Sequence, residues 1–356
     1  MGKAKEKADE PRFIPHGAAT LPFVTVDNYS LEIKDKDGFI GDKASKGAFR
    51  ELMDKWRKQL KELDLDPFGG APSEEIPKDK LAKLLASDDP EKAGFVQSVL
   101  EDFAQQLAAI IKRFLALKEW KGTERIVIGG GFQASQVGKV AVGRALLILR
   151  EAKIKIEIDL IKHDSDHAGL IGSAYLLPPW MFKGHDAFLA VDIGGTNIRS
   201  GVVSFRNGKS KPFSDLAVEK IELWRHADEE PRRDEAADRI VSMLNDLIAW
   251  SEKKGVRLVP VIGVGCPGHV NADGSIERGA QNLPGNWESS RFNLPEYLQA
   301  EIPKIGGEES IVIMHNDAVI QGLSDYGNSR DSKRWAVLTI GTGLGNAHFT
   351  NRELDD

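Results

Sequence analysis

The stretch LAVDIGGTNIRSGVV, residues 189–203, decides how the rest of the sequence is interpreted. Two apolar runs flank a turn that contains Gly194, Gly195 and Thr196, and this pattern predicts two strands joined by a tight turn. Because glycine has no side chain and permits unusual backbone angles, N–H groups of such a turn can converge on a phosphate. Ordinary hairpins also use glycine, so this stretch alone leaves a purely structural turn as the alternative.

A second stretch of the same kind lies near the end of the sequence. TIGTGLG, residues 339–345, again separates two apolar runs, with Gly341, Thr342 and Gly343 at the turn. The threonine hydroxyl can add a donor to the backbone N–H groups. Two such turns, each flanked by predicted strands, favour phosphate binding over ordinary turn chemistry.

A third glycine cluster, Gly129–Gly131, follows the apolar run 125–128. Gly130 and Gly131 would let a flat base or a phosphate approach the backbone. Taken alone, the cluster is equally a connection between a strand and a helix.

Two aspartates end predicted strands. Asp192 follows an otherwise apolar run beside the first glycine turn. A buried carboxylate needs a partner, a proton or a cation, and next to a phosphate turn the natural cation is Mg²⁺, bound directly or through water. Asp317 ends the run 310–316 and begins a predicted helix. It is therefore either the N-cap of that helix or a general base that takes a proton from a hydroxyl.

The bulk composition is ordinary for a soluble globular protein. The chain has 356 residues, of which 41% are hydrophobic and 29% charged, with a formal net charge of −6. We expect two lobes from this length, no nucleic-acid partner because the charges are interspersed, and no membrane partner because no apolar run is long enough. The single cysteine, Cys266, excludes an internal disulfide and a cysteine-rich zinc site, and favours a cytoplasmic location. Residues 1–12 are charged, which predicts a flexible arm without a secretory signal.

Apolar periodicity predicts strands and helices in alternation, which indicates an α/β fold. The longest helix is expected to begin at Pro90, with Asp89 as its start signal. Predicted helices cover residues 42–63, 90–120, 138–152, 168–177, 234–254 and 318–326. Predicted strands cover residues 125–131, 155–163, 218–224, 258–268 and 310–317 and the hairpins 189–203 and 334–351. Irregular or strand structure is expected over 20–33, a loop over 66–77 and a break over 178–186.

Four segments together resemble the ROK family of sugar kinases, within the actin–hexokinase ATPase superfamily. VDIGGTNIRSGVV and LTIGTGLGNAHF are similar to the two phosphate segments of that family. IGVGCPGHVNADGSI, followed by QNLPGNW, resembles the sugar-side segment, and IVIMHNDAVIQGL resembles the segment with the catalytic aspartate. All four follow the order of the family between residues 187 and 350.

The first half resembles the family in a different order. ERIVIGGGFQASQ is similar to the adenosine-side segment and HDSDHAGLIGSAYLL to the closing helix, which both lie at the C-terminal end of the family. The resemblance therefore predicts a circular permutation, in which residues 90–177 are the usual tail and 178–186 join it to the usual head. Permutation is tolerated where the old termini are close together. Residues 1–89 show little resemblance.

The resemblance implies a two-lobed actin/hexokinase-like (ribonuclease H-like) ATPase fold with permuted segment order. The larger, nucleotide-side lobe would comprise residues 1–163 with 327–356, and the smaller lobe residues 164–326. The implied activity is ATP- and Mg²⁺-dependent phosphorylation of a hydroxyl group on a hexose or amino sugar. Polyphosphate as donor and a homodimer both stay open.

The resemblance also implies roles for single residues. Asp317 would be the general base and Asp192 would serve Mg²⁺. The residues implied for the phosphates are Gly194, Gly195, Thr196, Gly341, Thr342 and Gly343; for the nucleotide, Gly130 and Gly131; and for the sugar, Gly268, Asn282 and Asn316.

The sequence departs from the family in two places. No Glu-x-Gly-His motif follows the second phosphate segment, and the permutation would place its counterpart near FIPHGAATLP, where His16 is either a sugar contact or a surface histidine. The cysteine-rich zinc motif is also missing, so we expect no zinc site. Two other functions stay open: a sugar- or nucleotide-binding protein without turnover, and an ATPase that acts on a non-sugar acceptor. The segment QNLPGNW favours a sugar.

Overall fold

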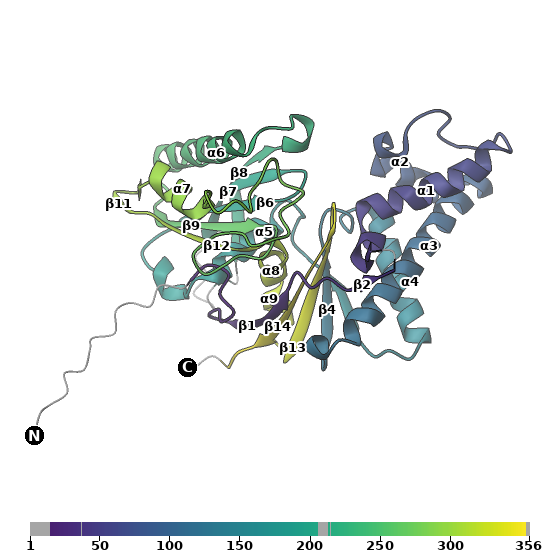
Figure 1. Cartoon of the computed structure of the whole chain (residues 1–356), viewed down its shortest axis with the longest axis horizontal. Helices are drawn as coiled ribbons and strands as arrows, with labels where there is room; N and C mark the ends of the chain where they lie inside the picture. The colour runs from purple at the N-terminus through teal and green to yellow at the C-terminus, as the bar shows by residue number, and fades with distance from the viewer. Residues whose placement is uncertain (1–14, 37, 206–212, 214, 354–356) are drawn as a thin grey trace, which may run out of the picture.

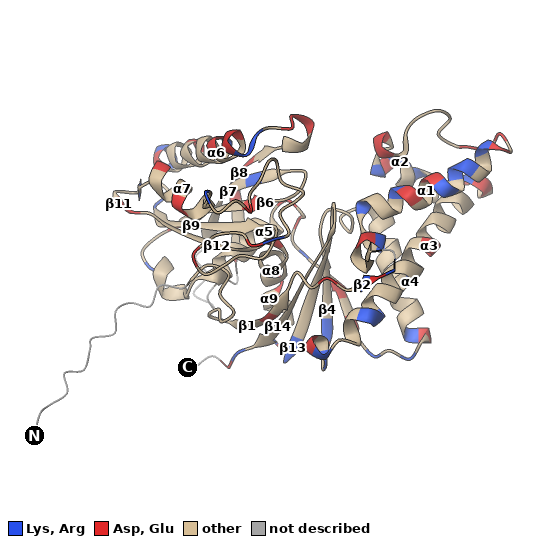
Figure 2. Cartoon of the chain, viewed as in Figure 1, with Lys and Arg blue, Asp and Glu red and all other residues tan. Residues whose placement is uncertain are grey.

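The computed structural model describes residues 15–36, 38–205, 213 and 215–353. Two five-stranded sheets lie next to each other in the middle of the molecule, with helices on their outer sides and between them (Figure 1). Basic and acidic side chains are interspersed along the outer helices (Figure 2). The arm predicted over residues 1–12 lies outside the described residues.

The first sheet has the strand order β12-β9-β6-β7-β8. Its strand β6 is buried at every residue, because apolar side chains occupy both of its faces. β7 pairs with β6 and β8 with β7 in antiparallel fashion, while β9 and β12 run parallel to β6. The bounds are β6 Ala187–Ile193, β7 Ile198–Phe205, β8 Leu216–Trp224, β9 Leu258–Cys266 and β12 Ile311–Asn316.

The second sheet has the order β1-β14-β13-β4-β5. Here β14 pairs with β13 and β1 with β14 in antiparallel fashion, while β4 and β5 run parallel to β13. Taken from β5 to β1, the second sheet therefore has the same pattern of parallel and antiparallel strands as the first sheet has from β12 to β8. The bounds are β1 Val24–Tyr29, β4 Arg125–Gly129, β5 Glu157–Leu160, β13 Arg334–Ile340 and β14 Leu344–Asn351.

In each sheet, one more antiparallel strand pairs with the outer strand of the hairpin. The two sheets differ in the position of that strand along the chain. In the first sheet β8 directly follows β7 along the chain, whereas in the second sheet the corresponding strand, β1, comes from the N-terminal part. Val24 pairs with Asn351, and the backbone N–H of Arg352 donates to the Phe23 carbonyl oxygen at 3.0 Å. The end of β14 therefore lies beside the start of β1.

Helices cover the outer sides of both sheets. α3 and α4 pack on each other beside the second sheet, and α6 and α7 lie on the first (Figure 1). The Asp89 carboxylate accepts hydrogen bonds from the first turn of α3, as predicted. The bounds are α1 Lys46–Lys61, α2 Lys78–Leu85, α3 Pro90–Leu115, α4 Gln136–Glu151, α6 Arg233–Lys254 and α7 Leu294–Glu301.

Two short helices fill the space between the sheets. α5 (Ala168–Gly172) follows β5 but contacts β6 and β7, and α8 (Asp317–Leu323) follows β12 but contacts β13 and β14. Each helix thus follows an edge strand of one sheet, β5 or β12, and packs on the other sheet. At their crossing, a Cβ atom on Gly172 would lie 1.8 Å from the Ile320 carbonyl oxygen, so only glycine permits this approach.

The predicted α/β class is confirmed. Most predicted elements are present within a few residues. The helix predicted over 42–63 begins at Lys46, after a 3₁₀ turn, and the helix predicted over 168–177 continues beyond Gly172 as a 3₁₀ turn. α2, α7, α9 (Tyr326–Ser329) and the strand pairs β2–β3 (Lys34–Asp35, Gly38–Phe39) and β10–β11 (Lys304–Ile305, Glu308–Glu309) were not predicted. Within the described ranges, no helix is both long and apolar enough to span a membrane.

Candidate active site

The two predicted phosphate turns meet between the sheets. The hydroxyl groups of Thr196 and Thr342 hydrogen-bond each other at 3.0 Å, although 146 residues separate them. A Cβ atom on Gly195 would lie 3.1 Å from Asn282 Cβ and 3.5 Å from Thr342 Cβ. Both turns and the QNLPGNW segment therefore share one place in the molecule.

Two backbone carbonyl groups of the first turn accept hydrogen bonds from residues that the sequence analysis did not identify. His226 is 3% exposed, and its Nε2 donates to the Gly194 carbonyl oxygen at 2.8 Å. The Ala227 backbone N–H donates to the Thr196 carbonyl oxygen at 3.3 Å. These bonds occupy carbonyl groups on the far side of the turn and fix its shape.

The third glycine cluster lies against the second turn. Gly130 has a φ of 85°, and a Cβ atom there would lie 2.4 Å from the Ile340 carbonyl oxygen. Both its backbone angle and its surroundings therefore require glycine. The backbone N–H of Lys46, at the start of α1, donates to the Gly341 carbonyl oxygen at 2.9 Å. Residues from the N-terminal region thus reach the phosphate turn directly.

Asp317 stands at the first position of α8. The N-cap is its neighbour Asn316, whose Oδ1 accepts hydrogen bonds from the N–H groups of Ala318 and Val319 at 3.0 and 3.2 Å. The alternative that Asp317 caps the helix is therefore wrong. The Ala318 Cβ lies only 3.0 Å from the position a Cβ would take on Gly345, so this segment adjoins the second phosphate hairpin.

Burial and a like charge perturb the Asp317 carboxyl group. Burial, followed by the negative charge of Asp192, raises the pKa of Asp317 to about 7, against the opposing effect of nearby N–H donors. Burial also raises the pKa of Asp192, which is 3% exposed; Arg199 opposes this shift from 3.5 Å. Arg199 is itself shared with Asp166, to which its Nε donates at 2.8 Å. Two incompletely compensated carboxylates thus act on each other.

We expect the raised pKa of Asp317 to make stability depend on pH. The native state holds its proton up to about pH 7, whereas the unfolded chain loses it near pH 4, so the contribution of this group to stability falls as pH rises through that window. Asp317→Asn should therefore be about 2 kcal/mol more stable than wild type at pH 8, a value discounted for partial exposure, and should gain less than half as much at pH 5. Urea unfolding at both pH values measures this. An equal difference at both pH values would contradict it.

Asn316 and Gly268 are joined by a hydrogen bond. Asn316 is 2% exposed, and its Nδ2 donates to the Gly268 carbonyl oxygen at 3.0 Å and to Ser30 Oγ at 3.2 Å. Asn282, by contrast, is exposed beside Gly195. Ser30 has a φ of 51° and is anchored to Asn346 through its backbone N–H. Neither Ser30 nor Asn346 carried a sequence signal, because their contact depends on the pairing of β1 with β14.

His16 lies along the edge of β12. Its Nδ1 accepts a hydrogen bond from the Met314 backbone N–H at 3.0 Å, and burial lowers its pKa. Its ring is next to Gly274, where a Cβ atom would lie 3.1 Å from the His16 Cδ2. The hydrogen bond of His16 is with the backbone of β12, upstream of Asp317.

The carboxylates are suited to Mg²⁺. This ion uses one or two carboxylates together with phosphate oxygens and water, and Asp192 and Asp317 supply such oxygens beside the phosphate turns. Burial raises the pKa of Asp317 most, and the repulsion from Asp192 that adds to it is what a cation would relieve. Among residues placed by the structure, no group of three or more His, Cys, Asp or Glu side chains could hold a metal alone.

Comparison with known proteins agrees with the motifs. No family model matches the chain. Glucokinase from Thermotoga maritima is 28% identical over 167 residues, which are 46% of this chain and 44% of that protein. Beta-glucoside kinase from Listeria monocytogenes is 30% identical over 170 residues, which are 46% of this chain and 47% of that protein. The chain thus matches somewhat less than half the length of each relative.

A solved ROK family glucokinase from Streptomyces griseus, in complex with glucose and AMPPNP, is 22% identical. The superposition covers 48% of this chain and 46% of that one, with a TM-score of 0.33, which is too low to support a conclusion on the fold. The relation therefore rests on the motifs and the sequence matches. Over 46% of its length, the chain is thus similar in sequence to a glucokinase and a beta-glucoside kinase.

Proposed function

We propose that the protein transfers a phosphoryl group from ATP to a hydroxyl group of a hexose or amino sugar. The proposal rests above all on the contact between Thr196 and Thr342, which joins the two predicted phosphate turns. Ala318, the neighbour of Asp317, adjoins the second hairpin at Gly345. Phosphoryl transfer is mostly positioning and charge neutralisation, and this place offers both.

Asp317 is the proposed general base. A carboxyl group with a pKa of about 7 can accept a proton near neutral pH, and its position at the start of α8 leaves the capping role to Asn316. As the hydroxyl oxygen attacks the terminal phosphorus, its proton passes to Asp317 and the bond to the leaving oxygen breaks. Mg²⁺, held through Asp192, would neutralise phosphate charge when bound.

The N–H groups and hydroxyls of the two turns are proposed to hold the phosphates, and Gly130 and Gly131 to lie by the nucleotide. Exposed Asn282 is proposed to meet a sugar hydroxyl, beside a loop shaped by the bond between Gly268 and Asn316. A sugar contact by His16 stays a prediction, as do the lobe boundaries, the homodimer and the cytoplasmic location.

Coupled measurement of ADP release over a panel of hexoses and N-acetylhexosamines tests this function. We expect at least one sugar to stimulate ADP release strongly. ATP binding without turnover on any sugar would favour the binding protein instead. ADP release that does not respond to any sugar would favour an ATPase with another acceptor.

We further propose that the chain is a circular permutation of the ROK order. The two sheets have the same strand order and directions, and only the second takes its outer strand, β1, from the other end of the chain. If β1 followed β14 directly, both halves would have the same succession of strands. The proximity of Arg352 to Phe23 makes that connection short.

A rearranged chain should therefore fold and function. We expect a variant that joins residue 353 to residue 15 through a Gly/Ser linker of about ten residues, and opens between Lys183 and Gly184, to keep its sugar-dependent turnover within about tenfold. The matched control keeps the natural order but lacks residues 1–14 and 354–356. An insoluble or inactive rearranged variant beside an active control would contradict the permutation.

A further inference from the structure

Three cationic side chains outside the ROK motifs gather beside the glycine turns. Lys46 and Arg50 lie one turn apart on α1, and Lys78 begins α2. They line one small pocket, whose other residues are Phe49, Leu81, Phe132, Ser135 and Val137.

The cluster of Lys46, Arg50 and Lys78, here called the basic cluster, is attached to the nucleotide side of the candidate site. The Lys46 backbone N–H donates to Gly341 in the second phosphate turn, and Lys78 Nζ donates to the Gly131 carbonyl oxygen. Arg225 contributes to the positive charge around Lys46. It directly precedes His226, which bonds the first turn at Gly194. The cluster therefore lies where the glycine segments meet.

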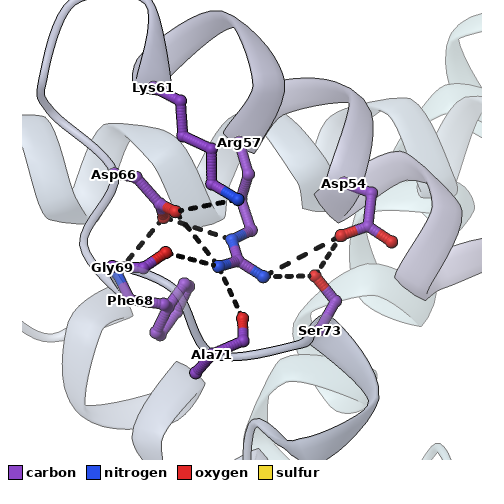
Figure 3. Close-up of polar contacts among 8 residues, drawn as sticks. All are labelled: Asp54, Arg57, Lys61, Asp66, Phe68, Gly69, Ala71 and Ser73. Carbon is purple, nitrogen blue, oxygen red and sulfur yellow. Dashed lines mark hydrogen bonds and ion pairs between the residues drawn. The ribbon is translucent and has the colours of Figure 1, made fainter.

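The fold fixes the geometry of the cluster. Arg57, on α1, is 2% exposed and holds the loop that leads to α2 (Figure 3). Its guanidinium group donates to the Asp66 carboxylate at 3.0 and 3.1 Å, to Ser73 Oγ at 2.7 Å and to the Ala71 carbonyl oxygen at 2.7 Å. These bonds tie α2, and with it Lys78, to α1.

The charges of Asp54 and Glu74 act on Arg50 of the basic cluster, but from beyond ion-pair distance. In the part of the chain that the structure describes, none of its three side chains forms an ion pair. Arg50 Nη2 donates to the Ile76 carbonyl oxygen at 2.8 Å, but Arg50 Nη1 is buried without a hydrogen-bond partner. A buried donor left unpaired is costly, and a bound acceptor would relieve that cost.

The electrostatic environment of the basic cluster also favours a bound anion. Burial first, and then the charges of Lys46 and Arg50, lower the pKa of Lys78, while Asp166 opposes the shift. Of the nearby acids, Asp166 already pairs with Arg199, and Asp54 lies 3.9 Å from Arg57. The N-terminus of α1, a helix of 16 residues, adds partial positive charge at Lys46. An anion with several negative groups fits such a place.

We propose that Lys46, Arg50 and Lys78 bind the phosphates of the donor that are not transferred, as a chain of linked phosphates. The proposal rests on the proposed kinase function and names a binding surface within residues 1–89. Arg and Lys are the side chains that bind phosphate most often. The shared chemistry is a linear phosphate chain, supplied by a nucleoside triphosphate or by inorganic polyphosphate.

Titration calorimetry of the full chain without sugar, with inorganic tripolyphosphate and with ATP, tests the proposal. We expect Lys46→Gln, Arg50→Gln and Lys78→Gln each to weaken tripolyphosphate binding by about tenfold or more. The matched control, Lys58→Gln with Lys83→Gln, removes exposed charges from the same helices and should bind as wild type does. Circular dichroism shows whether each variant is folded.

The outcomes separate the two donors. Equal losses for tripolyphosphate and ATP support a cluster that serves ATP, and a loss for tripolyphosphate alone supports inorganic polyphosphate. Unchanged tripolyphosphate affinity in folded variants, or no tripolyphosphate binding by wild type, overturns the proposal. Because no sugar is present, these results are independent of the turnover assay. If the cluster binds tripolyphosphate but no sugar is phosphorylated, the phosphate-binding surface stands, whereas the proposed function and the role of the bound phosphates as donor are both overturned.

Discussion

Asp317→Asn is expected to lower kcat for sugar phosphorylation by about 10²–10⁴-fold, the usual contribution of a general base. Asparagine has nearly the same shape and cannot accept the proton. Asn316 caps the helix through its Oδ1, and its Nδ2 donates to Asp317 Oδ1 at 3.1 Å, an acceptor that asparagine retains, so the helix should persist. ATP affinity should change little, because the proposed phosphate contacts come from the two turns and the basic cluster and not from this side chain.

Steady-state kinetics at saturating sugar and ATP, with calorimetric ATP binding, measures both effects. Asp325→Asn is the control: this carboxyl group is also buried with a raised pKa, lies beyond the other end of α8 and bonds Asn328 through Oδ1, which asparagine retains. The control should keep kcat within about twofold, since surface and remote changes rarely alter chemistry. An Asp317→Asn variant that keeps a tenth or more of wild-type kcat would show that Asp317 is not the base.

Gly172→Ala should lower the free energy of unfolding by about 3 kcal/mol or more. The backbone angles of Gly172, φ −61° and ψ −26°, suit alanine, so the backbone itself does not oppose the change. The added methyl group would instead fall 1.8 Å from the Ile320 carbonyl oxygen and force α5 away from α8. Since α5 follows a strand of the second sheet but packs on the first, and α8 does the reverse, the effect should reach the whole molecule.

Urea unfolding compares this variant with Gly143→Ala. Gly143 lies in α4, is exposed, and a Cβ atom there would meet nothing within 4 Å. Alanine at that position should raise stability by about 0.5–1 kcal/mol. Gly172→Ala with wild-type stability would mean that the helices do not cross as described.

The sequence was informative where a feature is local. Both glycine hairpins, the long helix α3 and its Asp89 cap follow from apolar periodicity and neighbouring residues, and all were predicted. Eight-residue helices such as α2 and α7 are too short for a clear period and were missed. The N-cap of α8 could not be assigned in advance, because Asn316 and Asp317 are both good capping residues and only the backbone angles distinguish them.

The parts of the site that were missed depend on contacts between distant segments. His226 holds the first turn from 32 residues away, and Ser30 reaches Asn316 across 286 residues. Lys46 meets Gly341 only because α1 docks on the second turn. No local pattern distinguishes these side chains from the other polar residues around them, whereas Asp192 and Asp317 are conspicuous as acids at the ends of apolar strands.

A crystal structure with a non-hydrolysable ATP analogue and a sugar that stimulates turnover tests the central claim most directly. We predict that the terminal phosphate lies between Thr196 and Thr342 and that one sugar hydroxyl lies within hydrogen-bonding distance of the Asp317 carboxylate. Phosphates bound away from both turns, or a sugar with every hydroxyl out of reach of Asp317, would contradict phosphoryl transfer at this site.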